Sequence, residues 1–224
     1  MRITRLVAGT VTAGLLGLAP LAVAAPGHAA DTWDTITVAT PSATRLVYGD
    51  DFYVSVDVDG TDGRDPEGTS TLMAMNAGST TWVPVATNTS AGSDFFEVKP
   101  RMNTTYKVVY TGYTDTDQGP NGDNYKPSES ASFTVRVARR ITYPSSGFVI
   151  KGKVKPDYGN KSIVIKVSTK KKQGFKAWKT ISTTSTGTYK ITLPRRGGTW
   201  YWSFTVKGDS KYAAGGFLWR TWVS

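Results

Sequence analysis

Residues 52–58 read FYVSVDV, and residues 148–154 read FVIKGKV. In both stretches apolar side chains recur at every second position, which is the period of a strand with one buried face. Similar short runs bounded by Gly, Pro, Asn and Asp recur along the chain, and helical periodicity is nowhere sustained. The chain is therefore predicted to be all-β. Its expected strands lie near 35–39, 52–58, 71–77, 81–87, 94–98, 104–111 and 131–137, then near 141, 148–154, 163–169, 177–183, 188–193, 201–206 and 217–223.

A single offset of 96 positions relates the two sets of strands and places, for example, Val54 on Ile150 and Tyr106 on Trp202. Two copies of a seven-stranded unit of about 100 residues have the size and strand number of immunoglobulin-like β-sandwiches. The predicted organisation is a leader at 1–29, an acidic sandwich at 30–138 and a basic sandwich at 139–224, joined by the short linker Arg139-Arg140.

Residues 1–29 have the layout of a secretory signal peptide. Arg2 and Arg5 supply a positive start, residues 6–25 are apolar but broken by Gly and Pro, and Gly27-His28-Ala29 offers small residues at the cleavage positions. A membrane anchor is the alternative, which the Gly, Pro and cleavage site disfavour. We expect a protein that is secreted, extracellular or associated with the cell surface, with no transmembrane segment in the mature chain.

Several segments of the remaining sequence resemble a known family. TWVPVAT (81–87), TTYKVVYTG (104–112) and SESASFTVRV (128–137) are echoed by AWKTIST (177–183), GTYKITLP (187–194) and YWSFTVKGDSKY (201–212). They look like the tandem bacterial Ig-like domains of secreted actinobacterial proteins, over nearly the whole chain after the leader. The resemblance implies an Ig-like fold and a role as a spacer, adhesive or binding module, without a shared catalytic motif.

The chain has no Cys, and its one His lies in the leader. Catalytic triads that use His, zinc sites built from Cys and His, haem bound by His and dithiol redox centres are therefore excluded for the mature protein. Ser168-Thr169-Lys170-Lys171 matches the Ser-x-x-Lys motif, but the elements that accompany this motif in enzymes are missing. We expect a protein that is not an enzyme.

The formal net charge of +10 is unevenly distributed between the two halves of the chain. Residues 31–137 carry 15 acidic and 7 basic side chains, net −8, whereas residues 138–224 carry 2 acidic and 18 basic ones, net +16. Successive strands of a sandwich run antiparallel, so alternate loops gather at the same end. The acidic loops are expected at the outer tip of the first sandwich and the basic loops at the opposite tip of the second.

The acidic loops suggest a divalent cation, because Ca²⁺ prefers about six to eight oxygen ligands. The spacing does not follow the EF-hand loop, and the alternative is a pair of solvated turns that use Asp-Gly and Asn-Gly for positive φ. No other cofactor is expected. The candidate ligands are Asp59, Asp62, Asp65, Asp115, Asp117 and Asp123.

The basic loops suggest an anionic polymer, because a surface rich in Lys and Arg concentrates polyanions. Export favours an anionic cell-wall polymer or an acidic polysaccharide over nucleic acid. The alternative is a face that only keeps the protein soluble. The candidate polyanion-binding residues are Lys170, Lys171, Lys172, Lys176, Arg195 and Arg196.

Strand alternation also predicts an aromatic and cationic patch on the outer face of the second sandwich. Trp202, and with it Trp200, is expected in the core, while side chains of the opposite parity point outward. The candidate ligand-binding residues are Lys166, Tyr201, Arg220 and Trp222. The alternative is that this face packs against the first domain or against a second copy.

Together these features predict a secreted binding or adhesion protein whose basic C-terminal domain attaches to anionic polymers of the cell envelope or the extracellular space. One competing hypothesis is a structural protein that assembles head to tail through its oppositely charged tips. Another is a binder or inhibitor of a protein partner.

Overall fold

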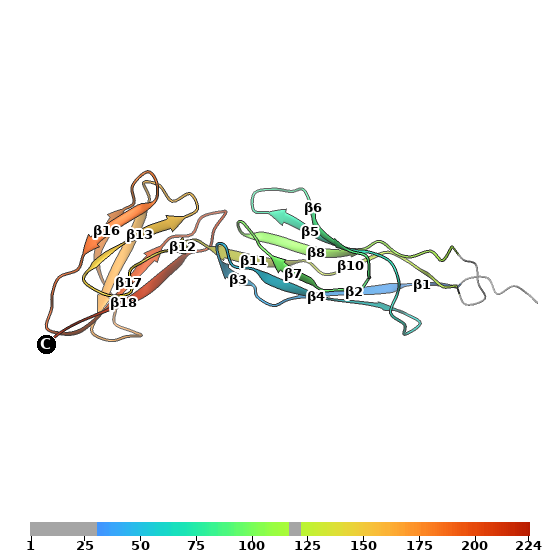
Figure 1. Ribbon diagram of the computed structural model, residues 1–224, viewed down its shortest axis with the longest axis horizontal. Coiled ribbons are helices and arrows are strands. Elements are labelled where there is room, and N and C mark those ends of the chain that lie inside the picture. Colours follow the sequence, from blue (N-terminus) through green and yellow to red (C-terminus); the bar gives the residue numbers. More distant parts are fainter. Residues whose placement is uncertain (1–30, 117–121) are drawn as a thin grey trace, which may run out of the picture.

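The computed structural model describes residues 31–116 and 122–224. Its regular structure consists of strands, and no helix occurs among the described residues. The all-β prediction is therefore confirmed. Figure 1 shows the strands in two groups that follow one another along the long axis of the molecule, which we call the N-terminal half (described residues up to Ala138) and the C-terminal half (from Arg139).

The N-terminal half contains two main sheets and a short strand pair. One sheet has the order β2 (Thr35–Pro41), β4 (Phe52–Gly60), β7 (Phe95–Val98). The other has the order β3 (Arg45–Val47), β11 (Phe133–Ala138), β8 (Thr104–Tyr110), β5 (Ser70–Asn76), β6 (Val83–Asn88), with β10 (Ser128–Glu129) also paired to β8. At the outer end, β1 (Thr32–Trp33) pairs with β9 (Asn124–Tyr125).

The C-terminal half repeats this arrangement with fewer strands. One sheet has the order β12 (Arg140–Ile141), β13 (Val149–Lys155), β16 (Thr188–Thr192). The other has the order β15 (Lys176–Ser182), β14 (Ser162–Ser168), β17 (Gly198–Val206), β18 (Gly215–Val223). Each half has a hydrophobic cluster of its own, built from side chains of both its main sheets.

Alternation along the strands explains how each half forms a core. Every second side chain of β4, starting with Phe52, is buried, and the side chains between them are exposed. Positions related by the 96-residue offset are buried alike, with Val54 and Ile150 both 0% exposed and Tyr106 and Trp202 at 3% and 0%. The repeat in the sequence therefore corresponds to equivalent positions in the two cores.

The segment expected to be a linker is part of the packing between the halves. Arg139 is buried, donates from Nε to the carbonyl oxygen of Pro156 (2.9 Å) and from Nη2 to Asp209 Oδ2 (2.6 Å), and lies with Cζ 4.2 Å from the ring centre of Tyr212. Arg140 instead reaches back to Asp50 of the N-terminal half. The two arginines therefore hold the junction from both sides.

Candidate functional site

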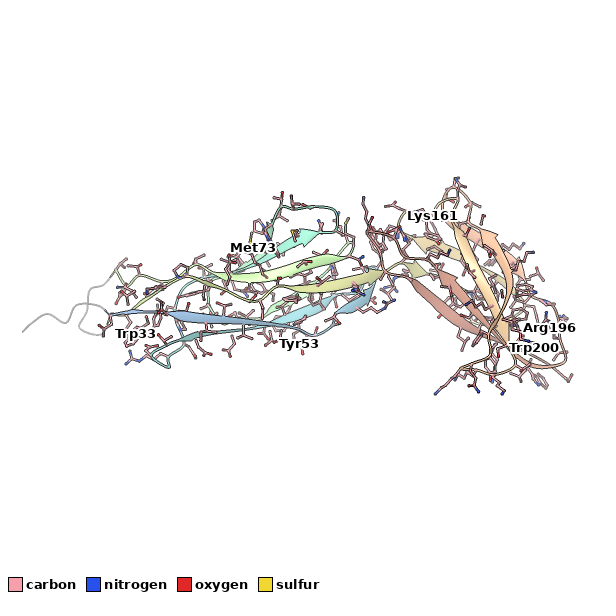
Figure 2. The ribbon with its side chains drawn as sticks, turned by 180° about the vertical axis from the view of Figure 1, so that it is seen from behind. Trp33, Tyr53, Met73, Lys161, Arg196 and Trp200 are labelled. Atoms are coloured by element: carbon pink, nitrogen blue, oxygen red, sulfur yellow. The ribbon has the colours of Figure 1, made fainter. Side chains whose placement is uncertain are left out.

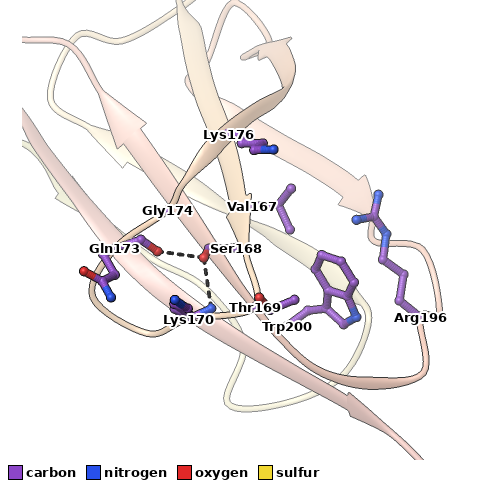
Figure 3. A pocket seen from close by; sticks show the side chains of 9 residues that line it. All are labelled: Val167, Ser168, Thr169, Lys170, Gln173, Gly174, Lys176, Arg196 and Trp200. Carbon is purple, nitrogen blue, oxygen red and sulfur yellow. Dashed lines mark hydrogen bonds between the residues drawn. The ribbon is translucent and has the colours of Figure 1, made fainter.

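The end of the C-terminal half contains a cavity of about 730 Å³, which we call the tip cavity. Figure 2 places Arg196 and Trp200 at the end of the molecule opposite Trp33. The cavity lies where the β14–β15 loop meets the β16–β17 loop, as Figure 3 shows. Its lining residues are Val167, Ser168, Thr169, Lys170, Gln173, Gly174, Lys176, Arg196 and Trp200.

Ser168 holds the β14–β15 loop in place. Its hydroxyl donates to the carbonyl oxygen of Gln173 (2.7 Å) and accepts from the backbone N–H of Lys170 (2.9 Å), as drawn in Figure 3. The side chain is buried, and Gly174 takes a φ of +71°, a conformation that favours glycine in the turn. In this fold the serine of the Ser-x-x-Lys match therefore stabilises the loop through two hydrogen bonds. These bonds also set the position of Lys170 at the cavity.

Stacking on tryptophan orients Arg196. Its Cζ lies 4.6 Å from the ring centre of Trp200 and 5.4 Å from that of Trp202, within the range of cation–π interactions. Trp200 Nε1 donates to the carbonyl oxygen of Gly197 (3.0 Å), which fixes the ring relative to the loop. The expectation that Trp200 is a core residue is wrong in part, because the ring is half-buried and its free side lines the cavity.

No carboxylate balances these cations. Among the described residues, Lys170, Lys176 and Arg196 take part in no ion pair, and none of the lining residues is Asp or Glu. Asp209, one of the two acidic residues after Arg139, is bound by Arg139 and lies 3.5 Å from Lys161 Nζ. The tip cavity is thus a concave, positively charged surface with an aromatic wall.

The six predicted polyanion-binding residues divide into three groups. Lys170, Lys176 and Arg196 line the tip cavity, and Lys171 lines a smaller cavity of about 280 Å³ together with Tyr201, Leu218, Trp219 and Arg220. Lys172 and Arg195 are exposed outside both, and Arg195 Cζ lies 5.1 Å from the ring centre of Phe148. Two distant stretches of sequence, 167–176 and 196–200, therefore bring half of the set to one concave surface.

The strand register places the predicted aromatic and cationic patch on one face. Tyr201 of β17 lies opposite Ser168 of β14 and opposite Arg220 of β18. On the same face, Lys166 lies one row to one side, with Ser203 and Leu218, and Trp222 lies one row to the other side, opposite Thr199; both are exposed. Tyr201 and Arg220 border the smaller cavity, so this face adjoins the basic loops.

At the acidic end, two of the carboxylates expected to bind a metal ion interact instead with an arginine. Arg64 Nη1 lies 2.6 Å from Asp123 Oδ2, and its Nε lies 3.9 Å from Asp62 Oδ2. Tyr125 donates its hydroxyl to Asp62 (3.1 Å), and burial, then this hydrogen bond, raises the pKa of Tyr125. An arginine therefore lies between two of the predicted metal ligands.

Two other predicted metal ligands, Asp59 and Asp65, take part in no ion pair of the described residues. Asp59 belongs to β4 and is exposed, although it was expected in a loop, and Asp65 is exposed in the β4–β5 loop. The backbone N–H of Asp115 donates to Asn124 Oδ1 (3.1 Å), and Asp117 lies outside the described residues. Within 31–116 and 122–224, no group of three or more Asp, Glu, His or Cys side chains is arranged to hold a metal ion.

Comparison with known proteins yields little. No family model and no curated protein match the chain. Among solved structures, the human OSCAR ligand-binding domain is similar at 15% identity with a TM-score of 0.28, covering 84% of this chain and 95% of that one. In the described part of the chain there is no helix long and apolar enough to span a membrane.

Proposed function

We propose that the chain is a secreted, non-enzymatic binding protein of two tandem Ig-like sandwiches, and that its tip cavity attaches it to an anionic polymer of the cell envelope or extracellular space. The sandwich assignment rests on the strand order, since β2-β4-β7 and β12-β13-β16 each face a sheet whose central strands follow the order of an Ig domain. The leader pattern at 1–29 supports export.

The observation that carries the proposal is the cluster of Lys170, Lys176 and Arg196 around Trp200 in a cavity without a carboxylate. Three fixed positive charges attract phosphate, carboxylate or sulfate groups, and the strength of such attraction falls with salt. The indole ring offers an apolar wall for the backbone of the polymer, such as the face of a sugar ring. A polymer supplies repeated charges and can therefore engage the exposed Lys172 and Arg195 as well.

Co-sedimentation with purified bacterial cell walls, polygalacturonate beads and neutral dextran beads tests the proposal. We expect the purified protein to bind the walls and polygalacturonate but not dextran. Its affinity should fall about tenfold or more between about 50 and 200 mM salt. The triple variant Lys170→Glu, Lys176→Glu, Arg196→Glu should lose this binding, because each anionic group then meets a negative charge.

A matched control keeps the change in net charge constant. Lys151→Glu, Lys179→Glu and Lys190→Glu reverse three exposed lysines of the same half away from the cavity. The control variant should bind almost as well as the original protein. Equal losses in the two triple variants would contradict the assignment to the tip cavity, and binding that survives in the first variant would refute it.

A further inference from the structure

Exposed apolar side chains are concentrated on two sheet faces. Of the eleven large apolar residues that are exposed in the described part of the chain, six lie on the outer face of β2-β4-β7 or on the outer face of β14-β17-β18. An exposed apolar patch of this kind is typical of an interaction surface. The six are Ile36, Val38, Tyr53, Phe96, Leu218 and Trp222.

The face on the N-terminal half combines apolar and acidic side chains. On β2, Ile36 and Val38 are 60% and 48% exposed, and they lie opposite Asp59 and Asp57 of β4 respectively. Further along the same face, the rings of Tyr53 and Phe96 lie with their centres 6.2 Å apart, and Phe96 is 70% exposed. We call this surface the acidic face.

The face on the C-terminal half combines apolar and basic side chains in the same way. Leu218 and Trp222 of β18 are 42% and 63% exposed and flank Arg220 on the same strand. Lys166 of β14 lies in the row of Leu218, with Ser203 of β17 between them. We call this surface the basic face.

The charges on both faces lack ion-pair partners among the described residues. Asp57 and Asp59 take part in none of the ion pairs of the described residues, and neither do Lys166 and Arg220. The acidic face repels a polyanion, so the proposed ligand of the tip cavity does not account for it. The two faces are nevertheless complementary, because each is an exposed sheet face with apolar side chains and the two carry charges of opposite sign.

We propose that the acidic face of one copy of this chain binds the basic face of a second copy. The two halves follow one another along the long axis (Figure 1), and they are joined through β11 and β12 without a long linker, so the faces of a single copy do not meet. Contact burying Trp222 and Phe96 removes apolar surface from water and opposes unlike charges. Because the two faces differ, the contact is heterologous and produces rings or open chains.

Sedimentation velocity over a range of protein concentrations tests this contact with two charge-reversed variants. In Asp57→Lys, Asp59→Lys both faces become basic, and in Lys166→Glu, Arg220→Glu both become acidic. We expect the original protein to associate as concentration rises, and each variant alone to associate at least about a hundredfold more weakly, because like charges then face each other. An equimolar mixture of the two variants should associate again, since opposite charges meet.

Controls separate this contact from a folding defect and from the tip cavity. The variant Lys151→Glu, Lys190→Glu reverses two opposed exposed lysines on the other sheet of the C-terminal half and should associate like the original protein. The Asp57→Lys, Asp59→Lys variant should still bind polygalacturonate, which keeps the two proposals distinguishable. A protein that stays monomeric at all concentrations, a mixture that does not recover, or association lost only when Lys170, Lys176 and Arg196 are reversed would each overturn the proposal.

Discussion

The two halves of the molecule share a strand order but treat their charged ends differently. At the acidic end, Arg64 lies between Asp62 and Asp123, and the side chain of Asp62 is only 6% exposed. At the basic end, Lys170 and Lys176 line an open cavity and have no carboxylate beside them. A run of like charges in a sequence is therefore a candidate binding surface only where the fold leaves those charges without partners.

The junction shows a second difference between the halves. Ile141 pairs with Val154 as Thr37 pairs with Val58, so Arg139 occupies the position that Thr35 has in the N-terminal half. The second copy therefore has a buried charge where the first has a half-buried threonine. The packing of Arg139 against Tyr212 and Asp209 ties the C-terminal half to the end of β11. Charged side chains thus stabilise the junction, form ion pairs with each other at the acidic end, and remain without ion-pair partners among the described residues at the tip cavity.

The largest effect is expected from emptying one core while leaving the other intact. Trp202 is 0% exposed, packs edge to face on Trp178 at 4.8 Å, and donates from Nε1 to Thr221 Oγ1 (2.9 Å). Trp202→Ala should cost about 3 to 5 kcal/mol of the stability of the C-terminal half, because it leaves a cavity and an unpaired hydroxyl. Urea unfolding followed by circular dichroism measures it.

The control for this change is Trp222→Ala on the same sheet. Its ring is 63% exposed, so the loss should stay within about 0.5 kcal/mol at protein concentrations where the chain is monomeric. Equal losses for the two tryptophans would show that the core assignment is wrong. In the N-terminal half, Tyr106→Ala should act as Trp202→Ala does in the other half.

A smaller loss is expected at the junction. Arg139→Met removes the charged hydrogen bond to Asp209 and the one to Pro156, and should cost about 2 kcal/mol. Arg140→Met is the matched control, because its pair with Asp50 is half-exposed and should contribute less than about 1 kcal/mol. Thermal unfolding of both variants measures the difference, and a larger effect at Arg140 would contradict the structural role of Arg139.

The pH dependence of the same pair follows from Asp209. Burial raises the pKa of its carboxyl, but hydrogen bonds from Arg139 and from the backbone of Lys211 and Tyr212 outweigh this, so the net pKa lies below 3.8. A depressed folded-state pKa contributes stability above the unfolded pKa of about 3.9, and this contribution disappears as the pH falls through the folded value. The stability difference between the original protein and Asp209→Asn should therefore be full at pH 7 and shrink below about pH 4. A difference that is constant down to pH 2 would contradict this assignment.

The smallest effect is expected at the acidic end and tests the comparison of the two tips. With Arg64 between Asp62 and Asp123, the melting temperature of the original protein should not change in about 5 mM Ca²⁺, a concentration above the dissociation constants of weak extracellular sites. Arg64→Ala removes the internal cation and should lower the melting temperature slightly, with partial recovery in Ca²⁺. Stabilisation of the original protein by Ca²⁺ would instead support the metal site expected from the acidic loops.

Local patterns predicted much of this molecule because they depend on neighbours in the chain. Alternation with a period of two was enough to place strands over Phe52–Val58 and to put Tyr201 and Arg220 on the outer face of one sheet. Alternation does not report where a strand ends, so Asp59 was expected in a loop although it extends β4. Trp200 has the parity of a core residue but lies near the end of its sheet, where the cavity begins.

The sequence by itself determined the all-β class, the repeat at 96 positions and the separation of charge between the halves, because strand period and composition are short-range or additive properties. Only the tertiary structure decided which charges find partners. Arg64 and Asp123 are 59 positions apart, and the pairing of Arg139 with Asp209 spans 70. Such contacts depend on how loops meet after the sheets have packed. Only the tertiary structure therefore distinguishes the cations of the tip cavity, which have no carboxylate among the lining residues, from the carboxylates of the acidic end, which lie beside Arg64.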